Sequence, residues 1–256
     1  MTTLRGSGTE SLDELKQAAA RAAVQKVQSG MVVGLGTGST AAFAVSALAE
    51  RMQTEGLQIV GVPTSERTAE QARSLGIPLA TLEEQPRLDL AIDGADEIEV
   101  GSLNLIKGAG GALLREKLVE ASAAELIIVA DASKKVAQLG TRFPVPVEVV
   151  RFGWKTTLAR VEAIGCAATL RLNAQGDPYL TDEQHYILDC QFGPMADPAK
   201  IADQLKGTVG VVEHGLFIGM AKEAIIALPS RQRDGVLTRI ETLQPGCEER
   251  GVRREK

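Results

Sequence analysis

Short apolar runs alternating with amphipathic stretches constrain this chain more than any other feature. Each run has the length of a strand, and the stretches after them place apolar residues at helical spacing. The first helix is expected at 11–30, where Ser11 and Glu14 have the spacing of a capping box. The runs are MVVGLG at 31–36, LQIVGVP at 57–63, IPLATL at 77–82, LDLAID at 88–93 and ELIIVAD at 125–131. This pattern predicts an α/β fold, a Rossmann-like and mostly parallel sheet with helices on both faces.

The order of elements changes after residue 140. FPVPVEVV at 143–150 carries alternate prolines and is expected to be an edge strand or a linker. A helix, two strands and a helix follow up to 207, so the order is that of a small α+β unit. We therefore expect a Rossmann-like domain at 1–139 and 208–256 and a small domain at 140–207, near a subunit interface. We expect the charged tail from Arg231 to be frayed or to make subunit contacts.

Charge and composition narrow the classes of partner. The net charge is -5 and the 28 Lys and Arg residues are dispersed, so no basic stripe is available to a nucleic acid. Three distant cysteines and two histidines suit neither a disulfide framework nor a zinc site. The N-terminus has no apolar segment typical of a signal peptide, and no apolar run is long enough to span a membrane. We expect a soluble cytoplasmic protein with a small-molecule partner, whose chemistry depends on carboxylates, lysine, hydroxyl groups and backbone amides.

The loop GLGTGST at 34–40 joins an expected strand to an expected helix. Ligands of open parallel sheets bind at such strand ends, and the free amides of a helix N-terminus suit an anion such as phosphate. The loop lacks the lysine of a P-loop, and Ser39 stands where a dinucleotide fingerprint needs glycine. A tight turn without a ligand would explain the glycines equally well.

Three more strand ends or loops carry polar side chains. DGADEI at 93–98 contains three acids, of which Asp93 has the better claim to the ligand edge, although such acids often only cap turns. KGAGG at 107–111 places Lys107 beside a glycine-rich helix start, which suits an oxyanion or a phosphate. Glu116, read alone, is a solvated helix acid between two bases. DASKK at 131–135 is a further polar strand end or an exposed turn.

Taken together, these segments resemble the type A family of ribose-5-phosphate isomerases. The similarity is carried by GLGTGST, DGADEI, LIKGAGGALLREK, VADASKK, FPVPVEV and GVVEHGLF, in this order, over about residues 13–220. It implies a reversible aldose–ketose conversion of ribose 5-phosphate and ribulose 5-phosphate through an enediolate, without metal or cofactor. The pathway would be the non-oxidative pentose phosphate pathway, and the Calvin cycle in a photosynthetic source. It also suggests a homodimer or a dimer of dimers.

The resemblance also implies roles for individual residues. Glu116 would move a proton between C1 and C2, while Asp93 and Lys107 would assist ring opening and oxygen protonation. Lys16 is a further candidate for phosphate contact. The implied substrate-binding residues are Thr37, Gly38, Ser39, Thr40, Asp93, Gly94, Ala95, Asp96, Lys107, Gly108, Ala109, Gly110 and Lys134. Asp96 would orient the sugar.

One residue departs from the family pattern, and two rival functions remain to be weighed. Ala109 stands where the family often has glycine, so this turn either uses ordinary dihedral angles or is shifted. A sugar-phosphate-sensing module is the main alternative, but the chain has no helix-turn-helix before residue 30 and carries both Glu116 and Lys107. A nicotinamide-dependent oxidoreductase is disfavoured by Ser39 and by the lack of an acid to bind ribose after the second strand.

Overall fold

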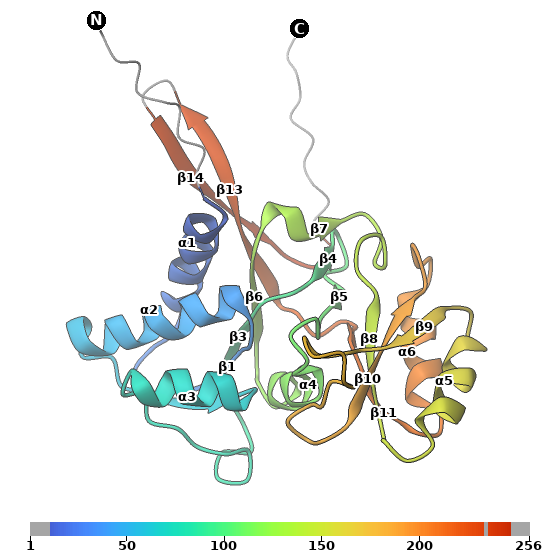
Figure 1. Ribbon diagram of the computed structural model, residues 1–256. Helices are drawn as coiled ribbons and strands as arrows, with labels where there is room; N and C mark the ends of the chain where they lie inside the picture. Colours follow the sequence, from blue (N-terminus) through green and yellow to red (C-terminus); the bar gives the residue numbers. More distant parts are fainter. Residues whose placement is uncertain (1–10, 233–234, 247–256) are drawn as a thin grey trace, which may run out of the picture.

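The main sheet of the molecule has six strands. The computed structural model describes residues 11–232 and 235–246. In spatial order the strands are β14 (Gly235–Leu243), β13 (Glu223–Gln232), β6 (Leu126–Asp131), β3 (Leu90–Asp93), β1 (Val32–Leu35) and β2 (Val60–Pro63). All neighbours are parallel except the β13–β14 hairpin, which extends beyond the body of the molecule (Figure 1). The mainly parallel α/β sheet predicted from the sequence is confirmed.

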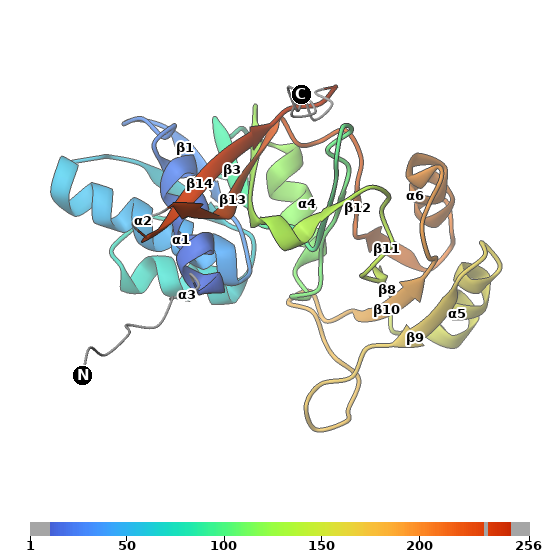
Figure 2. The same cartoon turned by 90° about the horizontal axis from the view of Figure 1, so that it is seen from above.

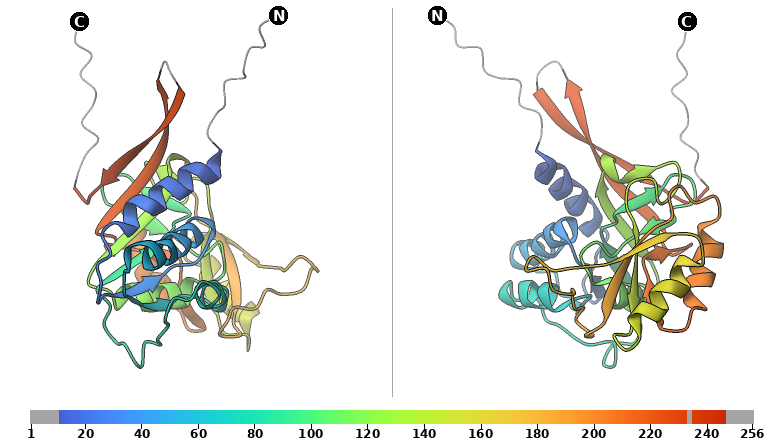
Figure 3. Two further views of the ribbon diagram at one scale, coloured as in Figure 1. Left: turned by 90° about the vertical axis from the view of Figure 1, so that its left-hand side faces the viewer. Right: turned by 45° about the vertical axis from the view of Figure 1, so that its right-hand side comes forward.

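Helices cover one face of this sheet as a layer. They are α1 (Leu12–Val24), α2 (Ser39–Glu55) and α3 (Glu66–Ser74), stacked side by side in Figure 3. Ser11 and Glu14 form the capping box expected for α1. Small residues such as Ala19 and Ala44 let α1 and α2 pack closely onto Val33 and Ile127 of the sheet. Burial of this apolar layer supplies the main core.

The opposite face of the sheet carries α4 (Leu113–Ala121) and a small mixed sheet. Val119 of α4 packs with Val62 and Leu88. The mixed sheet has the order β12 (Leu216–Phe217), β5 (Leu105–Ile106), β4 (Glu97–Glu99) and β7 (Lys135–Val136), with the short 3₁₀ turn η1 (Ala132–Lys134) before β7. Its residues Ile98, Leu105 and Phe217 pack on Ile128. Helices therefore lie on both faces, as predicted.

A third sheet lies beside α4, away from α1–α3 (Figure 2). Its order is β11 (Val211–His214), β8 (Val145–Val149), β10 (Tyr186–Gln191) and β9 (Ala167–Leu170), with α5 (Trp154–Glu162) and α6 (Pro198–Lys206) packed against it. β11 continues this sheet beyond residue 207, and the chain rejoins the main sheet at β13. The division into two domains at 139/140 and 207/208 stays a prediction.

Three expectations about individual segments are wrong. The run 77–82 is not a strand, because it pairs with β2 only at Gly61 and Pro78 has no N–H to donate. β8 is an inner strand, since Pro146 lies near its start and the residues 147–149 pair on both sides. A frayed tail is wrong over 235–243, which form β14, while the alternative, subunit contacts of the tail, stays a prediction; residues 247–256 lie outside the described part.

None of the helices in the described ranges has the length and apolar character that a membrane span requires.

Candidate active site

The polar loops selected from the sequence meet at one cleft of about 180 Å³. It lies beyond the carboxyl ends of β1, β3 and β6, as open parallel sheets generally place their ligands. Of the sequence-predicted residues, the walls include Thr37, Gly38, Ser39, Thr40, Gly94, Ala95, Asp96, Lys107, Gly108, Gly110, Glu116 and Lys134. Asp93 lies immediately behind Lys107, and Ala109 is exposed beside the cleft.

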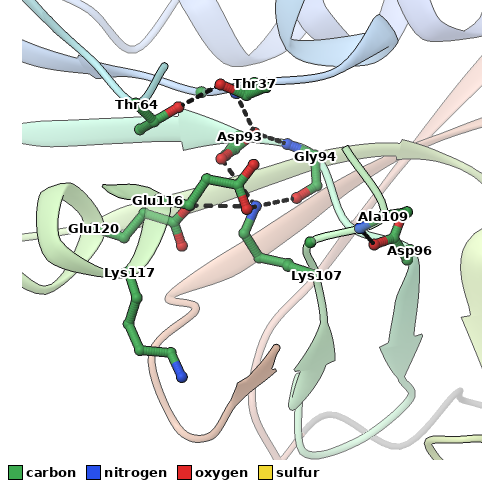
Figure 4. Close-up of polar contacts among 12 residues, drawn as sticks. Thr37, Thr64, Asp93, Gly94, Asp96, Lys107, Ala109, Glu116, Lys117 and Glu120 are labelled. Carbon is green, nitrogen blue, oxygen red and sulfur yellow. Dashed lines mark hydrogen bonds and ion pairs between the residues drawn. The ribbon is translucent and has the colours of Figure 1, made fainter. Parts of the chain in front are cut away.

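The end of β1 is locked to the end of β3. The Thr37 N–H donates to Asp93 Oδ1 at 3.0 Å, and the same oxygen accepts from the Gly94 N–H at 2.6 Å (Figure 4). A Cβ at Gly36 would lie 2.2 Å from Asp93 Cγ, so only glycine permits this approach. The Thr37 hydroxyl is buried among the hydroxyls of Thr64, Ser65 and Thr68. Its side chain therefore holds the loop, while its backbone orients Asp93.

The N-terminus of α2 faces the cleft. Gly38 precedes the helix with φ +115°, and Ser39 and Thr40 form its first turn. The first N–H groups of a helix have no intrahelical acceptor and carry the positive end of its dipole. This end of the cleft can therefore bind an anion such as phosphate.

Lys107 lies at the floor of the cleft and is almost completely buried. Its ammonium donates to the Gly94 carbonyl at 2.7 Å. Three carboxylates surround it: Nζ is 2.9 Å from Asp93 Oδ2, 3.2 Å from Glu120 Oε1 and 3.6 Å from Glu116 Oε2. Figure 4 shows these acids converging on the ammonium. β3 and α4 thus deliver three acids to one cation.

This surplus of acids sets the protonation of the cluster. Burial raises the pKa of Glu116 to about 8, opposed by Lys107 and assisted by Asp93 and Asp96. Burial also raises the pKa of Glu120 well above its usual range, although Lys107 opposes this. For Lys107 burial alone would lower the pKa, but the three acids outweigh it and raise the pKa. A cation beside an acid that titrates near neutral pH can stabilise an oxyanion and exchange a proton with a substrate.

The loop after Lys107 is fixed by Asp96 and by two glycines. The Ala109 N–H donates to Asp96 Oδ2 at 2.9 Å. Gly108 and Gly111 have φ of +104° and +82°, whereas Ala109 does not adopt positive φ. The methyl group of Ala109 is therefore accommodated by ordinary dihedral angles. Burial raises the pKa of Asp96, while the Ala109 N–H and nearby cations oppose that shift.

Gly215, which lies between β11 and β12, holds the backbone of Lys107. The Lys107 N–H donates to the Gly215 carbonyl at 2.9 Å, and the Gly215 N–H donates to the Pro146 carbonyl at 2.7 Å. A Cβ at Gly215 would come within 2.2 Å of the Lys107 carbonyl. The ring of Phe217 lies 5.4 Å from Lys107 Nζ. Both the backbone and the ammonium of Lys107 are thus held by fixed groups.

Two further lysines lie at the mouth of the cleft. Lys134 lines it from η1, with Nζ 4.7 Å from the Phe143 ring centroid. Lys16 lines it from α1 and pairs with Asp13 at 3.4 Å. Asp131, selected from the sequence as a strand-end acid, lines the cleft and caps η1 through the Ser133 N–H. The lysines give the open side of the cleft positive charge suited to an anionic ligand.

Two residues of this region were missed by the sequence reasoning. Glu120 lies one turn after Glu116 on the same helix face, a spacing that could have identified it. Arg171, which contacts the loop after Lys107, follows β9 and had no local signal. The interpretation of Glu116 as a solvated acid between two bases is wrong, since Glu116 is 3% exposed. Arg115 and Lys117 instead pair with Glu66, Glu183 and Glu213.

Comparison with known proteins agrees with this geometry. The family model described as Ribose 5-phosphate isomerase A (phosphoriboisomerase A) matches residues 60–231. Ribose-5-phosphate isomerase A of Synechococcus sp. (strain JA-3-3Ab) is 90% identical over 219 residues, 86% of this chain and 95% of the relative. The solved ribose 5-phosphate isomerase from Plasmodium falciparum is 40% identical with a TM-score of 0.84, covering 91% of this chain and 98% of that one.

A second similar solved structure is a complex with a ligand. It is a D-ribose-5-phosphate isomerase in complex with phospho-erythronic acid, 35% identical with a TM-score of 0.85, covering 92% of this chain and 100% of that one. The matches in sequence and in fold extend across both the main sheet and the sheet of β8–β11. The chain therefore belongs to the ribose 5-phosphate isomerase A family.

Proposed function

We propose that this chain interconverts ribose 5-phosphate and ribulose 5-phosphate, an aldose–ketose isomerisation through an enediolate. The observation that carries the proposal is the buried Lys107 ammonium, 2.9 Å from Asp93 and 3.6 Å from Glu116 at the floor of the cleft. An isomerisation of this kind needs a base next to a group that stabilises an oxyanion. Family membership supports the same reaction.

The substrate lies with its phosphate toward the open, positive part of the cleft. The N-terminus of α2 at Ser39 and Thr40 offers free amides, and Lys16 and Lys134 supply charge nearby. This leaves C1 and C2 of the sugar toward Lys107 and Glu116. Asp96 and the loop 107–110 bind the hydroxyl groups between the two ends.

The chemistry then requires one base and one cation. Ionised Glu116 removes the proton from C2 of the open-chain aldose, and the electron pair moves through C1 to its oxygen. Lys107 stabilises the resulting enediolate, because its ammonium faces the developing negative charge. Glu116 returns the proton to C1, while Asp93 and Lys107 assist ring opening and proton exchange at the oxygens. The ketose results without net change in oxidation state.

A purified-protein assay tests this proposal. We expect conversion of ribose 5-phosphate to ribulose 5-phosphate in excess chelator, and a loss of about 10²–10⁴-fold in kcat for Glu116→Gln. Glu125→Gln removes an exposed acid just after α4 and should match the wild type. Circular dichroism checks that each variant folds.

Other outcomes would assign a different function or mechanism. A folded wild type that binds the sugar phosphate without turnover would indicate a sensor, not an isomerase. Loss of turnover on adding chelator would contradict the mechanism based on Lys107. Full activity of Glu116→Gln would remove Glu116 from the role of base.

We further propose that the protein acts in the cytoplasm as a homodimer. The dispersed cysteines suit a reducing compartment, and the family resemblance suggests the assembly. Sedimentation equilibrium at micromolar concentration tests the dimer, since a single species of 27.1 kDa would contradict it. Fractionation of the source cells tests the location.

A further inference from the structure

We propose that Arg171 is a positioning residue that orients the substrate-binding loop 107–110 from the neighbouring sheet. Arg171 follows β9 at the start of the segment 171–185, here called the arm, which joins β9 to β10. Its Nη1 donates to the carbonyls of Gly108 at 2.9 Å and Ala109 at 3.1 Å. The inference rests on the proposed function, because it concerns binding of the same substrate.

Asp189 holds the guanidinium in the orientation in which it can hydrogen-bond these carbonyls. Asp189 of β10 accepts from both Nε and Nη2 of Arg171, the forked geometry in which arginine binds a carboxylate. This pairing leaves Nη1 directed at the loop. The Arg171 side chain is only 15% exposed, so water competes weakly for these donors. The Arg171 backbone N–H also donates to the carbonyl of Ile187 in β10 at 2.8 Å, which holds Arg171 beside Asp189.

The two hydrogen bonds from Arg171 determine where the amides of the loop point. In a planar trans peptide the N–H points opposite to the preceding carbonyl. The Gly108 carbonyl bonds Arg171, so the Ala109 N–H is directed away, where it reaches Asp96. The Ala109 carbonyl also bonds Arg171, so the Gly110 N–H is directed away from Arg171. Gly110 lines the cleft, and within residues 11–232 and 235–246 its N–H has no protein acceptor. This amide is therefore available to bind the ligand.

Other contacts from the arm reinforce the loop at its far end. Tyr179 packs on Gly111, where a Cβ would come within 2.3 Å of the phenol oxygen. Arg115 on α4 pairs with Glu183 at 2.6 Å and with Glu66 at 2.8 Å. Arg115 thus fixes the arm to α3 and α4 but has no contact with the carbonyls of the loop. A variant of Arg115 therefore tests the docking of the arm separately from the orientation of the loop peptides.

Lys107 does not depend on Arg171. Its backbone is held by Gly215, and its ammonium by Gly94 and the three acids. Loss of Arg171 should therefore weaken substrate binding and leave the chemical step nearly unchanged. In kinetic terms, KM rises while kcat is maintained.

The experiment compares Arg171→Gln, Arg171→Lys and Arg115→Gln with the wild type, using ribose 5-phosphate turnover and hydrogen exchange of residues 107–111. For Arg171→Gln we expect a KM about tenfold higher, the usual effect of losing hydrogen bonds to a charged donor, with kcat within about threefold. Arg171→Lys keeps a cation for the carbonyls and should restore most of the affinity. Arg115→Gln should leave KM unchanged.

Hydrogen exchange supplies a readout that does not require turnover. The Ala109 amide, which bonds Asp96, should exchange about tenfold faster in Arg171→Gln than in Arg115→Gln. The inference is overturned if KM and exchange in Arg171→Gln match the wild type, if Arg115→Gln raises KM equally, or if only kcat falls. An inactive wild type would reject the proposed function instead, while the exchange data would still test the grip of Arg171.

Discussion

Two lysines, the buried Lys107 and the partly buried Lys117, lie over the ring of Phe217, and they differ in how their charge is satisfied. Lys107 Nζ is 5.4 Å and Lys117 Nζ 4.6 Å from the ring centroid. Lys117 donates to Glu213 at 2.9 Å and to the carbonyls of His214 and Leu216 at 2.6 and 2.9 Å. Its ammonium therefore has an acceptor for each of its three protons.

Lys107 has the opposite balance. One carbonyl and three acids surround it, and apart from Lys107 no donor in the described part of the chain hydrogen-bonds Glu116 Oε2 or either oxygen of Glu120. Burial lowers the pKa of Lys117, opposed by Glu213, whereas the acids raise that of Lys107. Figure 4 shows Lys117 directed away from the cluster. An ammonium such as that of Lys117, with an acceptor for each of its protons, stabilises the fold. An ammonium beside a cleft, surrounded by more acids than it can neutralise, can take part in a reaction.

Removing the reactive lysine should have the largest effect. For Lys107→Met we expect kcat to fall by about 10³-fold, because the enediolate loses its cation. The rate is measured on protein shown to be folded by near-UV circular dichroism. If folded Lys107→Met keeps a tenth of the wild-type rate, Lys107 is not the reactive one of the two lysines.

The other lysine should matter for stability instead. Lys117→Met should lower the free energy of unfolding by about 2 kcal/mol, because two buried carbonyls lose their donor while Glu213 keeps Lys206. Urea unfolding measures this change, and kcat per folded molecule should stay within about threefold. A large fall in kcat at unchanged stability would place Lys117 in the chemistry.

The reactive cluster should also be visible in the pH dependence. Glu116 acts only when ionised, and its pKa is raised to about 8, so its ionised fraction grows as pH rises through that value. We expect kcat/KM to increase about tenfold per pH unit below pH 8 and then level off. The measurement is a profile of kcat/KM from pH 5.5 to 9. A profile already flat above pH 5.5 would show that Glu116 keeps an ordinary pKa.

The smallest change is expected at Glu120. Burial raises the pKa of Glu120 well above the usual range and so favours its neutral form, for which glutamine is a close substitute in shape and polarity. Glu120→Gln should leave kcat at pH 7 within about threefold of wild type. A hundredfold loss would mean that the cluster uses both glutamates.

The sequence predicted those parts of the molecule that depend on local pattern. The capping box at Ser11, the apolar strand at 126–131 and the polar strand end at Asp93 can each be identified within a few residues. β4 and β5 are too short to show a period, and Pro146 suggested an edge strand because pairing partners are not visible in a sequence. The fold class was therefore predictable, but the mixed sheet was not.

The same distinction applies to the candidate site. Gly36, Asp93 and Lys107 stand in motifs that position them by local geometry. The burial of Glu116 depends instead on how α4 packs against the sheet, and adjacent helix residues such as Arg115 and Lys117 face other directions. Arg171 reaches the loop across 63 positions of sequence, a contact that no local pattern encodes.

The two backbone hydrogen bonds of Gly215 have a consequence for engineering this enzyme. One glycine links the Lys107 backbone to Pro146 of β8. An excised main sheet would keep its parallel strands and the N-terminus of α2, yet it would lose the support that Gly215 gives to the reactive lysine. A minimal version of this catalyst must therefore retain the β8–β11 sheet as scaffolding, even though that sheet contributes none of the acids around Lys107.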